Sequence, residues 1–338
     1  MNNIKVEIIG CGNIGKRHIA VFDQNPSTDI IGICDINNGA ATEQASIYAN
    51  SFPIRNNFNE LITSSKADLI SICTPHHLHR PMTIEALNAG KNVLVEKPMA
   101  LTVSDSKAMI ESAKTNNKRL YVMKQNRFNV PITITKEALD QNKLGKIYMV
   151  QCNVYWNRNP EYYSNSDWRG QKAKEGGALF TQASHFIDLL IWWFGDVVAA
   201  KAMIDTKMQN VEVEDCGNAV MDFKSGVQGS IMWTTCVYNK NYEGSITIVG
   251  EKGTIKIGGK YLNKIDFWDV ENNPLADDID FTDLPNNYGK YQGTSSNHHK
   301  VVAEIIRDLN GEKSNIVEGE EGLKSIEAME MIYKDAGL

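Results

Sequence analysis

Three glycines close to the N-terminus constrain the fold of this chain more than any other feature. They follow a β-branched run at residues 6–9, precede a helical pattern, and are Gly10, Gly12 and Gly15. The spacing G-x-G-x-x-G between a strand and a helix is that of a dinucleotide-binding loop. In such a loop the first glycine permits a tight turn, the second lets a pyrophosphate approach the backbone, and the third lets the helix pack closely. We expect the phosphates to lie at the helix start, on Asn13 and Ile14.

An acidic residue in the expected place narrows the choice of cofactor. Asp35 ends the second apolar run, at the distance from Gly15 where a carboxylate binds the ribose 2′-hydroxyl. A carboxylate also repels a 2′-phosphate, and no arginine follows in residues 36–40. The pattern predicts NAD rather than NADP, and the alternative is a tight turn that binds no ligand.

The rhythm of apolar runs divides the chain in two. Over residues 1–124, short apolar runs alternate with helical patterns, which predicts a Rossmann domain with a doubly wound parallel sheet. Over residues 125–338, alternating strands predict an α+β domain with an open, mainly antiparallel sheet, for substrate binding and oligomerisation. Helices are expected there at 131–142, 177–194, 297–310 and 320–335, and a long loop at 269–297. The predicted fold class is α/β.

Composition excludes several classes of protein. A formal net charge of −6 argues against a nucleic-acid binder, and no apolar run is long enough to cross a bilayer. The six scattered cysteines predict a reducing compartment, so with a strand beginning almost at the first residue we expect a cytoplasmic protein. We predict no metal site, because the clustered His76, His77 and His79 lack carboxylate or cysteine companions.

Two further motifs end predicted parallel strands, at the sheet edge where ligands of open α/β sheets bind. Residues 73–79 place Thr74, Pro75 and His79 there, lining the expected cofactor channel. Residues 93–100 place Glu96 and Lys97 there, and Lys97 could carry a proton or bind a reacting hydroxyl. The alternative for Lys97 is an ordinary turn at a strand end.

The motifs GCGNIG, CTPHHLH, EKPMA and KQNRF, in that order, resemble the Gfo/Idh/MocA family of pyridine-nucleotide oxidoreductases. Members of that family oxidise or reduce a carbon of a sugar, sugar derivative or polyol. The resemblance implies that Lys97 is catalytic, assisting deprotonation of the hydroxyl from which hydride leaves, and that Glu96 and Gln125 lie in the cofactor site. It also implies that the open sheet mediates oligomerisation, as a homodimer or homotetramer.

Residues 176–195 resemble the second signature of the family, a Gly-Gly pair that opens a helix carrying a histidine. The resemblance implies that His185 is catalytic and binds substrate, while Asp188 is structural. Many members carry Asp or Asn four residues before this histidine, where this chain has Thr181. We expect Thr181 and Gln182 to hydrogen-bond a sugar. With Lys97 and His185 facing the cleft between the domains, the two would handle the hydroxyl proton.

Aromatic and basic residues gather at 155–177 and predict an anion site. Those that we expect to contact substrate or cofactor are Arg158, Tyr163, Trp168 and Arg169, with Trp168 and Arg169 toward the cofactor. The whole pattern resembles the WlbA/WbpB type of the family, which oxidises the 3-hydroxyl of UDP-N-acetyl-glucosaminuronic acid with NAD for bacterial surface polysaccharides. That resemblance implies further substrate-binding residues, namely Arg127, Asn129, Ser296 and His299.

Two other functions stay open. The first keeps the fold but changes the substrate to a free sugar, inositol or another polyol. The second is a non-catalytic sensor in which NAD regulates binding to a partner, although the presence of both Lys97 and His185 argues against it. Recycling of NADH by 2-oxoglutarate as a co-substrate is an open alternative that no residue decides.

Overall fold

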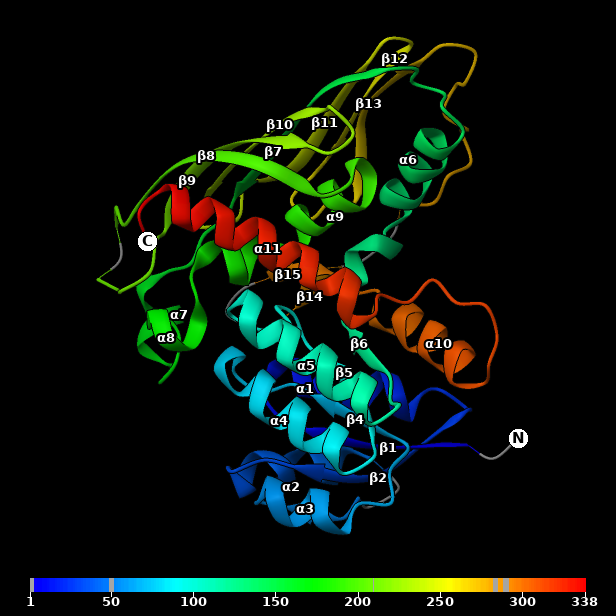
Figure 1. Ribbon diagram of the computed structural model, residues 1–338, viewed down its shortest axis with the longest axis vertical. Helices are drawn as coiled ribbons and strands as arrows, with labels where there is room; N and C mark the ends of the chain where they lie inside the picture. The colour runs from blue at the N-terminus through cyan, green and yellow to red at the C-terminus, as the bar shows by residue number, and fades with distance from the viewer. Residues whose placement is uncertain (1–2, 49–51, 209, 282–284, 288–291) are drawn as a thin grey trace. The chain divides into compact units, whose positions relative to one another are not determined.

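The computed structural model describes residues 3–48, 52–208, 210–281, 285–287 and 292–338. It divides into two compact units, whose helices and strands are labelled in Figure 1. The first unit contains Met1–Met123 and His298–Ile326, and the second contains Lys124–Asn297 and Glu327–Leu338.

A parallel sheet forms the centre of the first unit, which confirms the predicted Rossmann fold. Its described strands lie in the order β3-β2-β1-β4-β5-β6. They are β1 (Ile4–Ile9), β2 (Thr28–Cys34), β3 (Ile54–Arg55), β4 (Leu69–Ile72), β5 (Asn92–Val95) and β6 (Leu120–Val122). The order reverses between β1 and β4, and ligands bind beside such a reversal, at the carboxyl ends of the strands.

Helices cover this sheet because its strands are apolar on both faces; Val6, Ile70 and Val93, for example, are fully buried. The helices are α1 (Asn13–Asp23), α2 (Asn38–Ile47), α3 (Phe58–Ser64), α4 (His76–Asn88), α5 (Val103–Thr115) and α10 (His298–Leu309), and α11 (Gly319–Asp335) begins in this unit. The short β3 and α3 were not predicted, because two strand residues and two helical turns leave little periodicity in the sequence.

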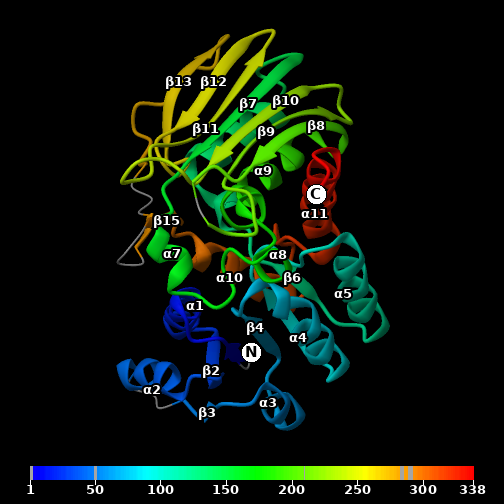
Figure 2. The ribbon, with the colours of Figure 1, turned by 90° about the vertical axis from the view of Figure 1, so that its left-hand side faces the viewer.

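A twisted sheet forms the second unit, with strands in the order β13-β12-β11-β7-β10-β9-β8 among the described residues (Figure 2). They are β7 (Ile147–Tyr155), β8 (Val197–Asp205), β9 (Cys216–Phe223), β10 (Gln228–Thr234), β11 (Glu243–Gly250), β12 (Gly253–Gly258) and β13 (Lys264–Val270). β7 and β10 pair in parallel and the other neighbours pair antiparallel. The predicted mainly antiparallel sheet is therefore confirmed.

One face of this sheet packs on the helix that carries His185. The helical elements of the unit are η1, a 3₁₀ helix (Gln125–Phe128), α6 (Val130–Asp140), α7 (Pro160–Ser164), α8 (Lys172–Glu175), η2, a π-helix (Leu179–Ala183), and α9 (Ser184–Phe194). Phe186 of α9 contacts Trp156 edge to face, and Phe194 contacts Phe223 of β9 in the same way. These aromatic contacts fix α9 against the sheet.

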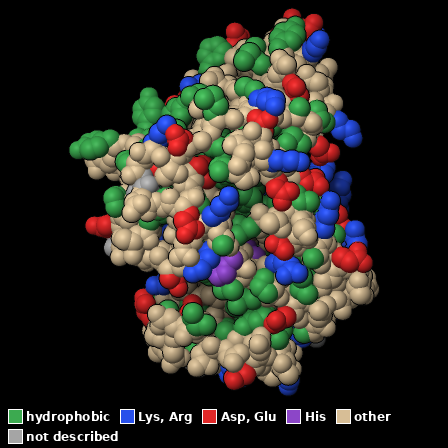
Figure 3. Space-filling model, turned by 60° about the vertical axis from the view of Figure 1, so that its left-hand side comes forward, with side chains coloured by type: hydrophobic (Ala, Val, Ile, Leu, Met, Phe, Trp, Pro, Cys, Tyr) green, Lys and Arg blue, Asp and Glu red, His purple; other side chains and the backbone are tan. Residues whose placement is uncertain are grey.

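The opposite face of the sheet carries exposed apolar side chains. Met203 of β8, Val220 of β9 and Met232 of β10 are 80%, 57% and 40% exposed. Figure 3 shows hydrophobic side chains on the surface beside Lys, Arg, Asp and Glu. This face is the surface predicted to mediate oligomerisation.

The structure differs from the prediction at the C-terminal end and in several strands. The prediction placed all of 125–338 in one domain, but α10 and the start of α11 group with the parallel sheet. The reason is local: α10 contacts α1, and the Val122 N–H of β6 donates to the Val317 carbonyl at 2.9 Å.

Within the predicted loop at 269–297, the described residues include a short antiparallel pair, β14 (Pro285–Asn287) and β15 (Gln292–Ser295). β8 was not predicted because its residues 197–205 are mostly half-buried or exposed and lack a clean apolar alternation. Within the described residues, no helix combines the length and the apolar character that crossing a membrane requires.

Candidate active site

The three glycines of the N-terminal loop have three different environments. Gly10 has φ +95°, and a Cβ there would lie 2.6 Å from the Cys73 carbonyl oxygen. A Cβ on Gly15 would lie 1.9 Å from the Gly10 carbonyl oxygen, so only glycine allows α1 to approach the loop. Gly12 is exposed and a Cβ there would meet nothing within 4 Å. Two glycines therefore serve the packing of the chain, and Gly12 leaves open backbone for a ligand.

Asp35 is fixed beside that loop. Its Oδ2 accepts the Cys11 N–H at 2.7 Å, and its Oδ1 accepts the Asn37 N–H at 2.8 Å. Gly12 gives α1 no side-chain cap, so the first N–H groups of α1, at Asn13 and Ile14, are directed at the space where an anion binds to a helix N-terminus. The geometry agrees with a dinucleotide whose phosphates meet α1 and whose ribose meets Asp35.

His79 joins the two loops that follow β4 and β5. Its side chain is fully buried, with Nδ1 2.7 Å from the Pro98 carbonyl oxygen and Nε2 2.9 Å from the Thr74 carbonyl oxygen. Burial lowers the pKa of His79. The ring therefore lies behind the loops and holds them together, whereas Thr74 and Pro75 are only half-buried.

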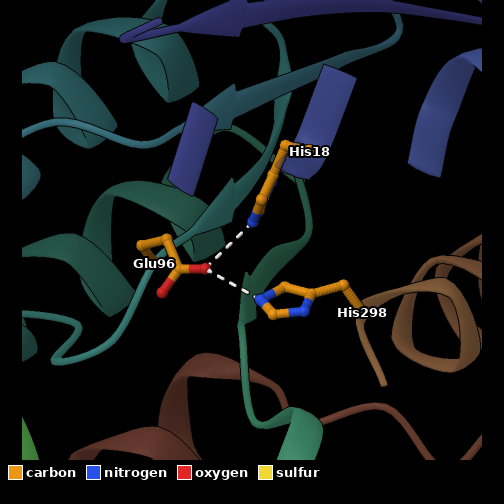
Figure 4. A group of neighbouring side chains, drawn as sticks. All are labelled: His18, Glu96 and His298. Atoms are coloured by element: carbon orange, nitrogen blue, oxygen red, sulfur yellow. Dashed lines mark hydrogen bonds and ion pairs between the residues drawn. The ribbon is translucent and has the colours of Figure 1, made fainter. Parts of the chain in front are cut away.

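Glu96 uses both carboxylate oxygens inside the first unit. Oε2 accepts the backbone N–H of Lys97 at 3.0 Å, and Oε1 lies 2.9 Å from Nε2 of His18 (Figure 4). His298 points at the same oxygen from the start of α10, with Nε2 at 3.8 Å. Sequence reasoning missed His18 and His298, because their partner Glu96, which directly follows β5, is distant along the chain. Lys97 itself is half-buried.

In the second unit, His185 and Asp188 are held by η1. The Nε2 of Gln125 lies 3.3 Å from Nε2 of His185, which is buried on α9. Arg127 grips Asp188 with two hydrogen bonds, of 2.8 and 2.9 Å, and Lys124 Nζ lies 3.4 Å from the same carboxylate. Burial alone would raise the pKa of Asp188, but Arg127 and Lys124 hold it well below its usual range. Arg127 is 6% exposed, so its guanidinium serves Asp188.

Thr181 and Gln182 lie on the π-helix just before α9. Thr181 Oγ1 is 3.0 Å from both the Glu175 carboxylate and the Gly177 carbonyl oxygen. Gln182 donates from Nε2 to the Tyr162 hydroxyl at 3.1 Å, and no described residue offers its buried Oε1 a hydrogen-bond partner. A buried acceptor without a partner is rare in folded proteins, and Oε1 can chemically accept a hydrogen bond from a hydroxyl group.

Two arginines surround Tyr162. The Arg169 guanidinium lies 4.0 Å from the centre of the tyrosine ring, and that of Arg158 lies 5.3 Å from it. Glu175 accepts the Gly170 N–H, and burial raises its pKa. The predicted Arg158, Tyr163, Trp168 and Arg169 are brought to this cluster, where the Tyr163 hydroxyl lies 3.4 Å from Thr235 Oγ1 and Trp168 lies beside Arg169. Tyr162 and Glu175 were not among the predicted site residues, although both stand in the same stretch of sequence.

Three predicted substrate residues lie elsewhere within their units. Asn129 is fully buried and donates to the carbonyl oxygens of Tyr261 and Leu262 at 3.2 and 3.3 Å, so it clamps backbone. Ser296 is half-buried just before α10, and His299 is exposed in the first turn of α10. Ser296 and His299 are therefore accessible to solvent, whereas the side chain of Asn129 forms its hydrogen bonds within the protein.

Two family models match almost the whole chain. Residues 4–124 match the NAD-binding Rossmann fold of an oxidoreductase family, and residues 136–337 match the C-terminal alpha/beta domain of that family. The first unit is therefore an NAD-binding domain, and the predicted cofactor is confirmed.

Solved structures and sequence relatives agree with this match. The WlbA dehydrogenase from Bordetella pertussis, in complex with NADH and UDP-GlcNAcA, is 35% identical with a TM-score of 0.89, over 99% of this chain and 97% of that chain. The WlbA dehydrogenase from Chromobacterium violaceum, in the same complex, is 35% identical with a TM-score of 0.91, over 100% and 94%. The levoglucosan dehydrogenase of Pseudarthrobacter phenanthrenivorans is 26% identical over 75% of this chain and 73% of its own.

Proposed function

The chain belongs to the Gfo/Idh/MocA family of oxidoreductases, and from that premise we propose that it oxidises the 3-hydroxyl of UDP-N-acetyl-glucosaminuronic acid. It is an NAD-dependent oxidoreductase that acts on a CH–OH group of a sugar or polyol. Similarity to two WlbA dehydrogenases over nearly the full length of the chain supports the nucleotide sugar as the substrate.

One observation carries the proposal within this chain: a buried, unpartnered acceptor stands in a cluster with two arginines. Gln182 Oε1 is the acceptor, and Tyr162 joins Gln182 to Arg158 and Arg169. The substrate offers hydroxyl donors for the amide oxygen, and its carboxylate and diphosphate are the kinds of group that guanidinium groups bind well. A free polyol offers the hydroxyls without the anions.

The reaction separates a hydride and a proton. NAD, when bound in the first unit, would supply the acceptor for a hydride from the carbon that carries the hydroxyl. A ketone forms as the C–H bond breaks. Lys97 accepts the proton of the hydroxyl group. His185 forms a hydrogen bond with the same hydroxyl group and orients it. Gln125 beside His185 holds the ring that does this, and Glu96 holds the backbone of Lys97.

A substrate panel tests the proposal. The purified protein with NAD receives UDP-N-acetyl-glucosaminuronate, UDP-N-acetylglucosamine, levoglucosan or myo-inositol, each with and without 2-oxoglutarate, and NADH and the keto product are measured. We expect oxidation of the UDP-uronate with a kcat/KM at least tenfold above the others. Lys97→Met should abolish turnover while NAD binding persists.

Other outcomes have distinct meanings. Preferred oxidation of levoglucosan, in keeping with the relative of that name, would replace the nucleotide sugar by a free sugar while Lys97 keeps its role. Binding of NAD with no turnover of any sugar would support the sensor. The 2-oxoglutarate arms show whether NADH is recycled in place.

A further inference from the structure

His18, Glu96 and His298 form a buried group in the first unit (Figure 4). It spans three elements of the first unit: α1, the end of β5 and the start of α10. All three side chains are at least 94% buried, so none can touch a substrate directly. The role of such a group must pass through a neighbour, and Lys97 is joined to it by a hydrogen bond.

We propose that His18 is a positioning residue for Lys97 and acts through Glu96. His18 fixes Oε1 of Glu96 at 2.9 Å, and Oε2 of the same carboxylate fixes the Lys97 N–H at 3.0 Å. Because the two donors hold opposite oxygens, the carboxylate cannot rotate without losing one of them. The inference rests on the proposed catalytic role of Lys97.

The other nitrogen of His18 extends the chain of contacts into the sheet. Nδ1 lies 2.8 Å from Oγ of Ser71, a fully buried residue of β4. The connectivity Ser71–His18–Glu96 is that of a hydrolytic triad, but a substrate cannot reach a serine buried inside a strand. The network therefore locks α1, β4 and β5 together at the turn that presents Lys97.

The charges around His18, Glu96 and His298 favour a hydrogen-bonded network over a bound metal ion. Burial opposes a charge on His18, but Cys73 and Glu96 outweigh it and raise the pKa of His18. The groups that face this network are Cys73 toward His18, Lys97 toward Glu96, and Arg17 and His299 toward His298. The positive groups Arg17 and Lys97 oppose a divalent cation, whereas an imidazolium paired with Glu96 leaves the local charge balanced.

His298 offers a matched control inside the same group. It is as buried as His18 and points at the same oxygen, but at 3.8 Å its Nε2 is beyond hydrogen-bond distance. Burial lowers the pKa of His298 to about 3, so the ring is neutral. If packing alone mattered, replacing either histidine would have the same effect on Lys97.

Turnover of the five variants H18Q, H18L, H298Q, H298L and E96Q is the test, with H298L as the control matched to H18L. We expect H18L to lower kcat by about tenfold or more, because it removes the donor to Glu96, with KM for NAD within about twofold. H18Q keeps a donor and should recover most of that loss, and H298Q should stay close to wild type. E96Q should resemble H18L, since an amide can accept from only one of the two donors.

The pH profile provides a readout that packing would not move. H18Q removes the positive charge beside Glu96, so the remaining carboxylate favours the ammonium form of Lys97. In H18Q the rising limb of the kcat–pH profile should then shift to higher pH by roughly half a unit. The profile of H298Q should not shift. Equal losses in H18L and H298L, or an unshifted limb in H18Q, would overturn the inference.

A measurement without substrate separates this inference from the proposed function. Nitrogen NMR of the histidine side chains should show His18 as an imidazolium at pH 8 in the wild type and as a neutral ring in E96Q. A wild type that oxidises no sugar defeats the proposed function alone. A His18 ring that carries no proton on Nε2 in the wild type defeats the inference, whatever the substrate, because it cannot donate to Glu96.

Discussion

At the scale of the residue, many polar side chains of the site are committed to protein partners. Arg127 serves Asp188, Asn129 serves the backbone at 261–262, and Glu96 serves His18 and Lys97. Sequence motifs identified several of these residues as functional, but they could not say whether a side chain faces a ligand or another part of the protein. Two such protein contacts lead to testable predictions about stability. They are the ion pair of Arg127 with Asp188 and the hydrogen bonds of the buried Glu214.

Replacing Arg127 should affect stability first. R127M removes both guanidinium hydrogen bonds from the buried Asp188, and we expect it to lower the free energy of unfolding by roughly 3–5 kcal/mol. The double variant R127M/D188N removes the uncompensated charge and should lose clearly less. Urea unfolding of both variants measures this. A stable R127M with a raised KM for the sugar would instead place Arg127 in substrate binding, as the sequence predicted.

Glu214 makes stability depend on pH. Its Oε1 accepts the Tyr333 hydroxyl and the Leu179 N–H, both at 2.7 Å, yet burial raises the pKa of Glu214 to about 7 from 4.5. The folded form then binds a proton that the unfolded form has released, so stability falls as pH rises from 4.5 through 7. The stability of E214Q relative to wild type should improve by roughly 3 kcal/mol between pH 4.5 and pH 8. A constant difference across this pH range would mean that Glu214 stays ionised.

At the scale of the element, many candidate site residues lie on the loops that follow β1, β4 and β5 in the first unit and on the π-helix before α9 in the second unit. The positions of these loops can be predicted from the sequence, because apolar runs bounded by glycine and proline indicate where parallel strands begin and end. The π-helix at Leu179–Ala183 lies inside the helix predicted over 177–194, and its extra residue per turn leaves no mark in that pattern. It is held by long-range contacts, with the Leu179 N–H on Glu214 and Thr181 on Glu175.

The difference between local patterns and long-range contacts explains which parts of the fold and of the candidate site could be predicted from the sequence. The two folds and the cofactor follow from local patterns and motifs, whereas the roles of Asp35 and of the stretch around Arg158 and Arg169 stay predictions. His18 and His298 were not predicted, because a partner such as Ser71 for His18, 53 residues away, has no local signature. The placement of α10 with the parallel sheet was missed for the same reason.

Two glycines of one loop should respond differently to the same change. A Cβ at Gly12 meets nothing within 4 Å, so G12A should keep the thermal stability of the wild type but weaken NAD binding by about tenfold or more, because the methyl group occupies space for the pyrophosphate. A Cβ at Gly15 meets the Gly10 carbonyl at 1.9 Å, so G15A should unfold at a clearly lower temperature. Calorimetry and NAD titration measure both, and an unstable G12A or a stable G15A would contradict this division of roles.

At the scale of the whole molecule, the open sheet face predicts association of copies. Met203 faces Asn218 across the β8–β9 pair, and Asn218 faces Met232 across the β9–β10 pair, so exposed apolar side chains occupy neighbouring strands. An exposed apolar surface of this kind marks an interaction site. We expect a homodimer or homotetramer.

Charged substitutions on this face should dissociate the oligomer. The double variant V220E/M232E should convert the assembly to the 37.8 kDa monomer in light scattering, because like charges would face each other across a symmetric interface. I47D, a comparable change at a 63% exposed residue of α2, is the control and should not alter the mass. An unchanged mass in the double variant would place the interface elsewhere.

The central claim is that the chain removes hydride from carbon 3 of a nucleotide sugar, and isotope transfer tests it directly. UDP-N-acetyl-glucosaminuronate deuterated at carbon 3 is incubated with NAD and the wild-type protein, and the products are analysed by mass spectrometry. We predict deuterium in the reduced nicotinamide, or in 2-hydroxyglutarate when 2-oxoglutarate is present, and a 3-keto sugar. Turnover that leaves the deuterium on the sugar, or no turnover of this substrate by a protein that binds NAD, would contradict the account.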